Sequence, residues 1–198
     1  MNMTEIEPIA LFDMDGTLCD YDQSLLNALA PLRGPNEPEV TSLRDAPDYV
    51  RKRADIIRAS ELWWQNLPRF QLGWDVLDVA KDLEFNIMIL TQGPRRNPAS
   101  WAGKKRWIDD NLGPDTDVTI TRDKGIVYGK VLVDDFPGYI ERWLSWRDRG
   151  LVIMPTNESN QGFSHPQVIR YDGKNLEHVQ RTMQIARDRK RGEPLKLP

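Results

Sequence analysis

The sequence predicts an α/β fold in which a doubly wound, Rossmann-like parallel sheet carries helices on both of its faces. Three observations lead to this prediction: short apolar runs recur along the chain, amphipathic segments lie between them, and several of the runs end in acidic or hydroxyl residues. Apolar runs without alternation are typical of parallel strands, because helices cover both faces of such a sheet. Strands that alternate with helices indicate an open, doubly wound arrangement.

Six apolar runs bounded by turn-forming residues are the predicted strands: 8–12, 86–91, 117–121, 130–134, 151–155 and 168–171. Apolar residues at spacings of three and four predict helices over 74–83, 101–112, 139–146 and 175–189. Glycines follow two of these segments, where they act as helix stop signals. Four tryptophans at helical spacings are expected in the core: Trp101, Trp107, Trp143 and Trp146.

One segment departs from this alternation. The chain between Asp15 and Thr91 is far longer than one crossover helix requires. Its first half is loop-like, and 48–67 has the pattern of one or two charged helices. We therefore expect a core domain of residues 1–20 and 86–198 and a helical cap inserted at 21–85, with the helix 74–83 assignable to either. Ligands of such sheets bind at the carboxyl ends of the strands, so the cap should lie over the site.

Composition narrows the class of protein. The chain has 198 residues and one cysteine, Cys19, so no intrachain disulfide can form and a cytoplasmic setting is expected. The sequence shows no signal-peptide pattern and no apolar stretch near the ~20 residues of a membrane span, so no membrane partner is expected. A formal charge of −3 argues against a nucleic-acid-binding surface.

Polar residues with complementary chemistry occur at successive strand ends. They are Asp13 and Asp15, Thr91, Lys124, and the pair Asp134 and Asp135. The ends of parallel strands share one edge of the sheet, where these carboxylates would repel each other unless a cation neutralised them. Hard oxygen ligands suit Mg²⁺. A hydroxyl, a lysine and a metal around one carboxylate can receive a phosphoryl group.

These residues also carry a family resemblance. Asp13-Met-Asp15-Gly-Thr17 resembles the first motif of the haloacid dehalogenase superfamily, and Thr91, Lys124 and Asp134-Asp135 resemble its second, third and fourth motifs. Four further stretches, 89–94, 105–113, 120–124 and Asn160-Gln161, are similar to the 5'(3')-deoxyribonucleotidase family. The resemblance implies a Mg²⁺-dependent phosphatase with a small helical cap that hydrolyses nucleoside monophosphates.

The resemblance further implies a role for each site residue. Asp13 is the nucleophile that forms an aspartyl-phosphate, and Asp15 is the general acid and base and lends its main-chain carbonyl to the metal. Mg²⁺ is held by Asp13, by the Asp15 carbonyl and by the pair Asp134 and Asp135. Asp135 is the preferred direct ligand of the pair, with Asp134 orienting the site or holding Lys124. Thr91 donates to a phosphate oxygen, and Lys124 offsets the charge of the transition state. Two other lysines are set aside, Lys104 because it lies within a helix and Lys130 because it starts a strand.

Substrate selection is expected from the cap and the first loop. The candidates are Tyr21, Tyr49, Trp63, Trp64 and Gln92. Tyr21 stands at the spacing from Asp13 where deoxyribonucleotidases have an aromatic, and Gln92 stands where they often have a small hydroxyl residue. Trp63 and Trp64 could equally pack a small core within the cap. The basic residues after Thr91 form either a solvated face or a steering patch for phosphorylated substrates.

Two other functions stay open at this point. The same chemistry could act on a sugar phosphate, another small metabolite or a polynucleotide 3'-phosphate. A non-catalytic phosphoacceptor of the receiver type also combines an acid cluster, Mg²⁺, a hydroxyl and a lysine, but its adjacent acids end the first strand, whereas here they come last. A tryptophan-rich cap or helix face could also serve a homodimer.

Overall fold

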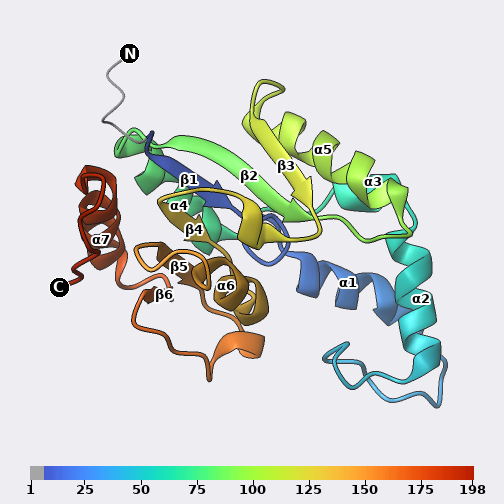
Figure 1. The fold of residues 1–198 in the computed structure, drawn as a ribbon. Helices are drawn as coiled ribbons and strands as arrows, with labels where there is room; N and C mark the ends of the chain where they lie inside the picture. Colours follow the sequence, from blue (N-terminus) through green and yellow to red (C-terminus); the bar gives the residue numbers. More distant parts are fainter. Residues whose placement is uncertain (1–6) are drawn as a thin grey trace.

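The computed structural model describes residues 7–198. Within this range the chain forms a six-stranded, fully parallel sheet in the order β3-β2-β1-β4-β5-β6 (Figure 1). The strands are β1 (Ile9–Phe12), β2 (Asn86–Gln92), β3 (Asp117–Thr121), β4 (Val131–Val133), β5 (Leu151–Pro155) and β6 (Val168–Tyr171). Strand β1 lies inside the sheet, with β2 and β3 on one side of it and β4, β5 and β6 on the other. This is a doubly wound arrangement, so the predicted fold class is confirmed.

Helices fill the connections between the strands. They are α1 (Tyr21–Leu29), α2 (Asp48–Arg58), α3 (Glu61–Gln65), α4 (Gln71–Asp82), α5 (Pro98–Leu112), α6 (Pro137–Leu144) and α7 (Leu176–Asp188). Short 3₁₀ turns accompany them in the described part of the chain: η1 (Ala30–Leu32), η2 (Lys124–Ile126) and η3 (Glu158–Asn160). None of the helices in residues 7–198 combines the length and apolar composition that crossing a bilayer requires.

Alternate residues of the central strands pack on opposite faces of the sheet. Ala10 and Phe12 join the apolar cluster that includes α4, α5 and α7, whereas Leu11 joins the cluster under α6. Trp107 and Trp143 are fully buried in these two clusters, as predicted. Trp101 and Trp146 are not in the core, which corrects the prediction for them. Trp101, on α5, is exposed and donates its indole N–H to the Pro94 carbonyl oxygen, and Trp146 is exposed beyond the end of α6.

Helices α1, α2 and α3 form a separate layer beside the carboxyl edge of the sheet (Figure 1). Helix α1 is absent from the sequence-based prediction. Asp20 caps it by accepting a hydrogen bond from the Gln23 amide, and Leu25 and Leu29 are buried against α2. A long irregular loop separates α1 from α2 in the sequence. The packing that stabilises α1 is therefore not visible in the local sequence pattern.

The α1–α3 layer contacts the rest of the molecule where α3 packs against α5. Gly103 of α5 makes their closest approach, since a Cβ at this position would lie 2.5 Å from both the Glu61 carbonyl oxygen and the Trp64 Cβ. The Arg58 carbonyl accepts hydrogen bonds from Trp64 Nε1 and from Asn97 Nδ2, the N-cap of α5. Helix α4, in contrast, packs its buried face onto the sheet. The division into core and cap stays a proposal, with α4 best grouped with the core.

Candidate active site

Three carboxylates meet at the carboxyl edge of the sheet. Asp13 follows β1, and Asp134 and Asp135 follow β4, its neighbour in the sheet. The register is fixed by backbone hydrogen bonds, such as the one from the Asp13 amide to the Val133 carbonyl at 2.8 Å. All three side chains are buried, and each offers an oxygen within 4.8 Å of the others. The parallel sheet therefore assembles the acid cluster that its strand ends predict.

Lys124 enters this cluster from η2. Its ammonium nitrogen lies 2.7 Å from Asp13 Oδ1 and 2.7 Å from Asp134 Oδ2, and 4.5 Å from the centroid of the Tyr139 ring. Burial lowers the pKa of the Lys124 amine, but the two carboxylates outweigh it and raise the pKa above its ordinary value. Lys124 is therefore a fixed positive charge beside Asp13.

Asp135 is held by neutral donors rather than by a lysine. Thr17 Oγ1 donates to its Oδ1 at 3.3 Å and Asn157 Nδ2 donates to its Oδ2 at 2.7 Å, while Asn160 Nδ2 donates to its backbone carbonyl at 2.9 Å. Burial raises the pKa of the Asp135 carboxyl well above its ordinary value, and the neighbouring Asp134 raises it further. Burial likewise raises the pKa of Asp134 to about 7, against the opposing effect of Lys124.

A turn at Gly16 brings the chain from Asp15 back toward Asp135. Gly16 has φ +73°, a left-handed conformation that glycine adopts without strain. A Cβ at this position would lie 2.5 Å from Asp135 Oδ2. The glycine therefore permits both the turn and the close approach to the acid cluster.

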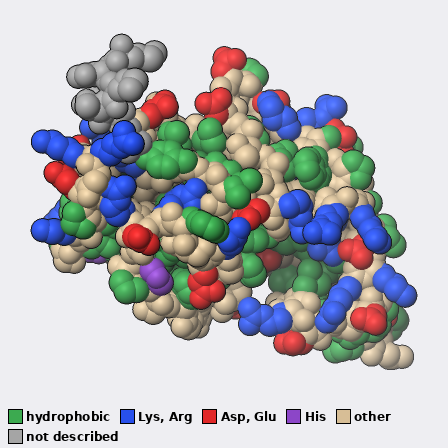
Figure 2. All heavy atoms as spheres, viewed as in Figure 1, with side chains coloured by type: hydrophobic (Ala, Val, Ile, Leu, Met, Phe, Trp, Pro, Cys, Tyr) green, Lys and Arg blue, Asp and Glu red, His purple; other side chains and the backbone are tan. Residues whose placement is uncertain are grey.

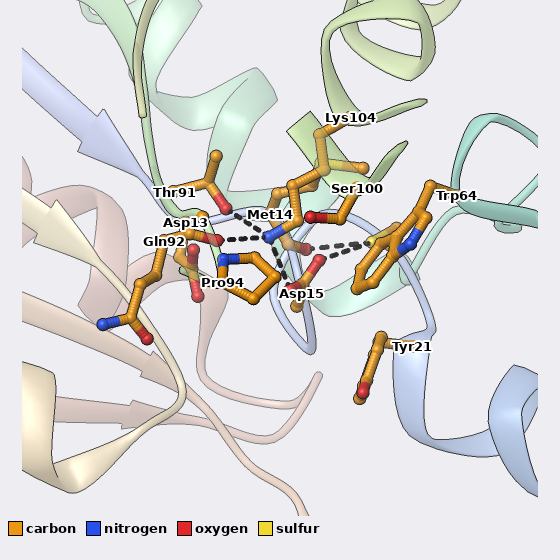
Figure 3. A network of polar contacts seen from close by, with 12 residues as sticks. Asp13, Met14, Asp15, Tyr21, Trp64, Thr91, Gln92, Pro94, Ser100 and Lys104 are labelled. Atoms are coloured by element: carbon orange, nitrogen blue, oxygen red, sulfur yellow. Dashed lines mark hydrogen bonds and ion pairs between the residues drawn. The ribbon is translucent and has the colours of Figure 1, made fainter. Parts of the chain in front are cut away.

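A second lysine, Lys104 of α5, binds the other half of the site (Figure 3). Its ammonium nitrogen lies 2.7 Å from Asp15 Oδ2, 2.9 Å from Thr91 Oγ1 and 2.8 Å from the Gln92 carbonyl oxygen. Burial raises the pKa of the Asp15 carboxyl, Lys104 opposes the rise, and the nearby Asp13 adds to it. A raised pKa is what a carboxyl needs to donate a proton near neutral pH.

The charges of the site fit a divalent cation. Four carboxylates, Asp13, Asp15, Asp134 and Asp135, face two ammonium groups, those of Lys104 and Lys124. When all four acids are ionised, two negative charges stay uncompensated within this group. The three clustered acids offer only hard oxygen ligands, the donor type that Mg²⁺ prefers. The residues present therefore fit a bound Mg²⁺ at Asp13, Asp134 and Asp135.

The site opens into a cavity of about 1870 Å³ between the sheet edge and the α1–α3 layer. Figure 2 shows this hollow, with Lys and Arg side chains around it. Three of the candidate substrate-binding residues line the cavity: Tyr21, Trp64 and Gln92. Trp63 is half-buried behind them in the packing of the α1–α3 layer, and Tyr49 is exposed on α2 beside Arg53. Neither Trp63 nor Tyr49 lines the cavity.

Sequence comparison decides between the families that could carry such a site. The human cytosolic 5'(3')-deoxyribonucleotidase is 30% identical over 142 residues, which are 63% of this chain and 69% of the human protein. The chain belongs to the 5'(3')-deoxyribonucleotidase family. This membership agrees with the resemblance of the four motifs to the phosphatases of the haloacid dehalogenase superfamily, and it favours a hydrolase over a receiver-like module.

Two further comparisons agree with this assignment to the deoxyribonucleotidases. A candidate 5'(3')-deoxyribonucleotidase of Bordetella pertussis is 26% identical over 138 residues, 65% of this chain and 74% of that protein. A candidate β-phosphoglucomutase of Thermotoga maritima shares the fold, with a TM-score of 0.51 and 14% identity over 89% of this chain and 98% of its own. No family model matches the sequence.

Lys104 of this deoxyribonucleotidase-family chain is set aside on sequence grounds because it lies within a helix. The structure corrects this exclusion, since Lys104 is fully buried and contacts both Asp15 and Thr91. The sequence does contain a pattern that indicates burial of this lysine. Lys104 precedes Trp107 and Ile108 by three and four residues, which places it on the apolar stripe of α5. A lysine on such a stripe is buried with partners.

Proposed function

We propose that this chain is a Mg²⁺-dependent phosphomonoesterase that hydrolyses nucleoside monophosphates through an aspartyl-phosphate. The observation that carries the proposal is the position of Asp13: a buried carboxylate beside Lys124, in an acid cluster that lines a large cavity. A carboxylate nucleophile divides one difficult displacement into two easier ones. Membership of the deoxyribonucleotidase family supports the phosphatase chemistry. The metal, the residue roles and the substrate are parts of the proposal.

In the first step, a carboxylate oxygen of Asp13 forms a bond to phosphorus while the bond from phosphorus to the leaving oxygen breaks. Asp15 is protonated at the start of this step and gives its proton to the leaving oxygen, so that an alcohol departs instead of an alkoxide. Its raised pKa supports this role. The hydrogen bond between Asp15 and Lys104 holds the carboxyl in place for the transfer.

In the second step, Asp15 takes a proton from water as the water oxygen bonds to phosphorus. The bond between phosphorus and the Asp13 oxygen breaks, which releases inorganic phosphate and restores both carboxyls. The Thr91 hydroxyl accepts a hydrogen bond from Lys104, so its own O–H can donate to an oxygen of the phosphoryl group. Lys104 holds Asp15 and Thr91 in position, and Lys124 does the same for Asp13 and Asp134. Mg²⁺ held by Asp13 and Asp135 would offset the negative charge that gathers on these oxygens.

The nucleotide substrate is supported by the 5'(3')-deoxyribonucleotidase relatives and by the cavity. The cavity contains aromatic side chains close to the acids, and nucleobases stack on aromatic rings. One of them, Phe136, is exposed to the cavity, and a sugar phosphate alone would provide no base to stack on its ring. The arginines that line the cavity would attract any phosphorylated ligand, so they do not favour another phosphorylated metabolite or a polynucleotide 3'-phosphate over a nucleoside monophosphate.

Steady-state phosphate release with and without Mg²⁺ tests this proposal. The substrates are deoxyribonucleoside and ribonucleoside monophosphates, 2-deoxyribose 5-phosphate and a 3'-phosphorylated oligonucleotide. We expect at least one nucleoside monophosphate to have the highest kcat/KM, and Asp13→Asn to abolish turnover in a protein that melts normally. Equal, feeble turnover of every nucleotide would contradict the substrate assignment, and near-full activity of Asp13→Asn would contradict the mechanism.

A further inference from the structure

Phe136 presents an exposed aromatic ring to the same cavity from the core side. It directly follows Asp135, and its backbone amide donates to Asp134 Oδ1 at 3.0 Å. Its side chain is 49% exposed, although it is apolar and lines the cavity. An exposed ring beside the acid cluster is within reach of a substrate whose phosphate lies at Asp13.

The ring of Phe136 is held in place by its neighbours. Its centroid lies 4.9 Å from that of Tyr139, with the planes at 61°, an edge-to-face contact. Gly138 provides the space for the ring, since a Cβ at that position would lie 2.9 Å from Phe136 Cε1. Both neighbours belong to the first turn of α6, so the helix orients the ring before any ligand arrives.

The aromatic rings on the cap side are less available. Trp64 is only 3% exposed: Tyr21 stacks with it at 5.5 Å, Trp63 meets its edge at 5.0 Å and Lys104 Nζ lies 5.2 Å from its centroid. Tyr21 also contacts Trp63, and its hydroxyl accepts a hydrogen bond from Arg58 at 3.3 Å. These three rings stabilise one another and leave little surface for stacking a ligand.

We infer that Phe136 is a specificity-determining residue, on whose ring the nucleobase of the substrate stacks. The inference rests on the proposed function and adds a core-side subsite to it. Base stacking accepts any nucleobase, because every base has a π face. The subsite therefore distinguishes nucleotides from phosphate esters that have no planar group, and it does so through substrate binding rather than through the chemical step.

The test compares two substrates in Phe136→Leu, a variant that keeps the backbone donor to Asp134. One substrate is thymidine 5'-monophosphate, and the other is 2-deoxyribose 5-phosphate, which lacks the base. We expect kcat/KM for the nucleotide to fall at least about five-fold, mainly through KM, as for the loss of one stacked base. The value for the sugar phosphate should change less than about two-fold, because no stacking is lost.

Two further variants sharpen the result. Gly138→Ala keeps the ring of Phe136 but displaces it, and should reduce the preference for the nucleotide in the same direction. Trp146→Leu removes a ring that is 69% exposed and does not line the cavity, and should leave both substrates unchanged. An unchanged nucleotide KM in Phe136→Leu, or equal losses for the two substrates, would overturn the inference. Failure of the proposed function would differ, since the wild-type protein would then show no preference for the nucleotide.

Discussion

The ammonium of Lys104 lies 2.7 Å from the carboxylate of Asp15, although the two residues are 89 positions apart in the sequence. The same nitrogen contacts the Thr91 hydroxyl and the Gln92 carbonyl oxygen. An ammonium has three N–H donors, so these partners use all of them. The site therefore contains two lysine-centred groups, one at Asp13 and one at Asp15.

Replacement of Lys104 by methionine should lower kcat about 10²-fold, the usual effect of misplacing a reacting group, because Asp15 and Thr91 would lose the ammonium that positions them. The matched control is Lys105→Met, the next residue of α5, which is partly exposed and pairs with Asp109. This control should leave kcat almost unchanged. Phosphate release at saturating substrate measures both variants, and equal losses in the two would contradict the role of Lys104.

Replacement of Asp15 by asparagine should affect poor leaving groups most. Loss of a general acid typically costs about 10²- to 10⁴-fold, so nucleotide turnover should fall by that amount. p-Nitrophenolate leaves without protonation, so p-nitrophenyl phosphate should still phosphorylate Asp13 and release a burst of about one equivalent before slow turnover. Stopped-flow absorbance detects this burst. Equal loss for both substrates without a burst would contradict the acid role of Asp15.

Removal of divalent cations should abolish activity and lower thermal stability, because the acids at Asp13, Asp134 and Asp135 would repel each other. A ligand at a hundred-fold excess over its Kd stabilises the native state by about 2.7 kcal/mol, so Mg²⁺ should raise Tm by several degrees. Asp135→Asn should reduce this shift, whereas Asp78→Asn, on the exposed side of α4, should keep it. Differential scanning fluorimetry with EDTA or Mg²⁺ measures the shift, and a Tm independent of Mg²⁺ would contradict the metal site.

Replacement of Gly103 by alanine should destabilise the protein. Alanine favours a helix by about 1 kcal/mol over glycine, but its Cβ would lie 2.5 Å from the Glu61 carbonyl oxygen, where backbone must move. Overpacking of this kind costs about 1–3 kcal/mol, so we expect a lower Tm and, because Lys104 is adjacent, a lower kcat. Ala102→Leu adds bulk on the exposed side of the same helix, with a helix propensity close to that of alanine, and should change neither. A raised Tm in Gly103→Ala would contradict tight packing of α3 on α5.

Acidification should weaken the loop that precedes α2. Hydrogen bonds from Arg53, at 2.5 and 3.0 Å, lower the pKa of Glu37 to about 2, and the Gly34 amide contributes. A lowered pKa in the folded state stabilises the fold above the ordinary value of 4.5, and this contribution is lost as the pH falls from there toward 2. The Tm difference between the wild type and Glu37→Gln should therefore shrink over this range, whereas Glu39→Gln should show no such trend. A constant difference would contradict the pairing with Arg53.

The sheet and most of the site were predictable because both depend on local pattern. An apolar strand that ends in a polar residue places this residue at the sheet edge, so Asp13, Thr91 and Asp134 could be brought together from the sequence alone. Residues whose placement depends on packing between distant helices could not. Lys104 reaches Asp15 only because α3 and α5 fix the helix, and α1 is stabilised by α2 across an irregular loop.

The cap aromatics show the same limit. The sequence identifies Tyr21, Trp63 and Trp64 as rings near the substrate but does not tell a ring that binds a ligand from a ring that packs against its neighbours. The structure distinguishes them by exposure, since Trp64 is buried among other rings and Phe136 is not. Phe136 carried no signal beyond its position after the acid pair.

The turn at Gly16 also has a consequence for interpreting other sequences. Any side chain at this position would strain the backbone at φ +73° and collide with Asp135 Oδ2. One residue thus reports on two separate requirements, the path of the chain and the integrity of the ligand set. A related chain that retains both aspartates but carries a bulkier residue at this position should be suspected of having lost the reaction, even where every titratable group is still present.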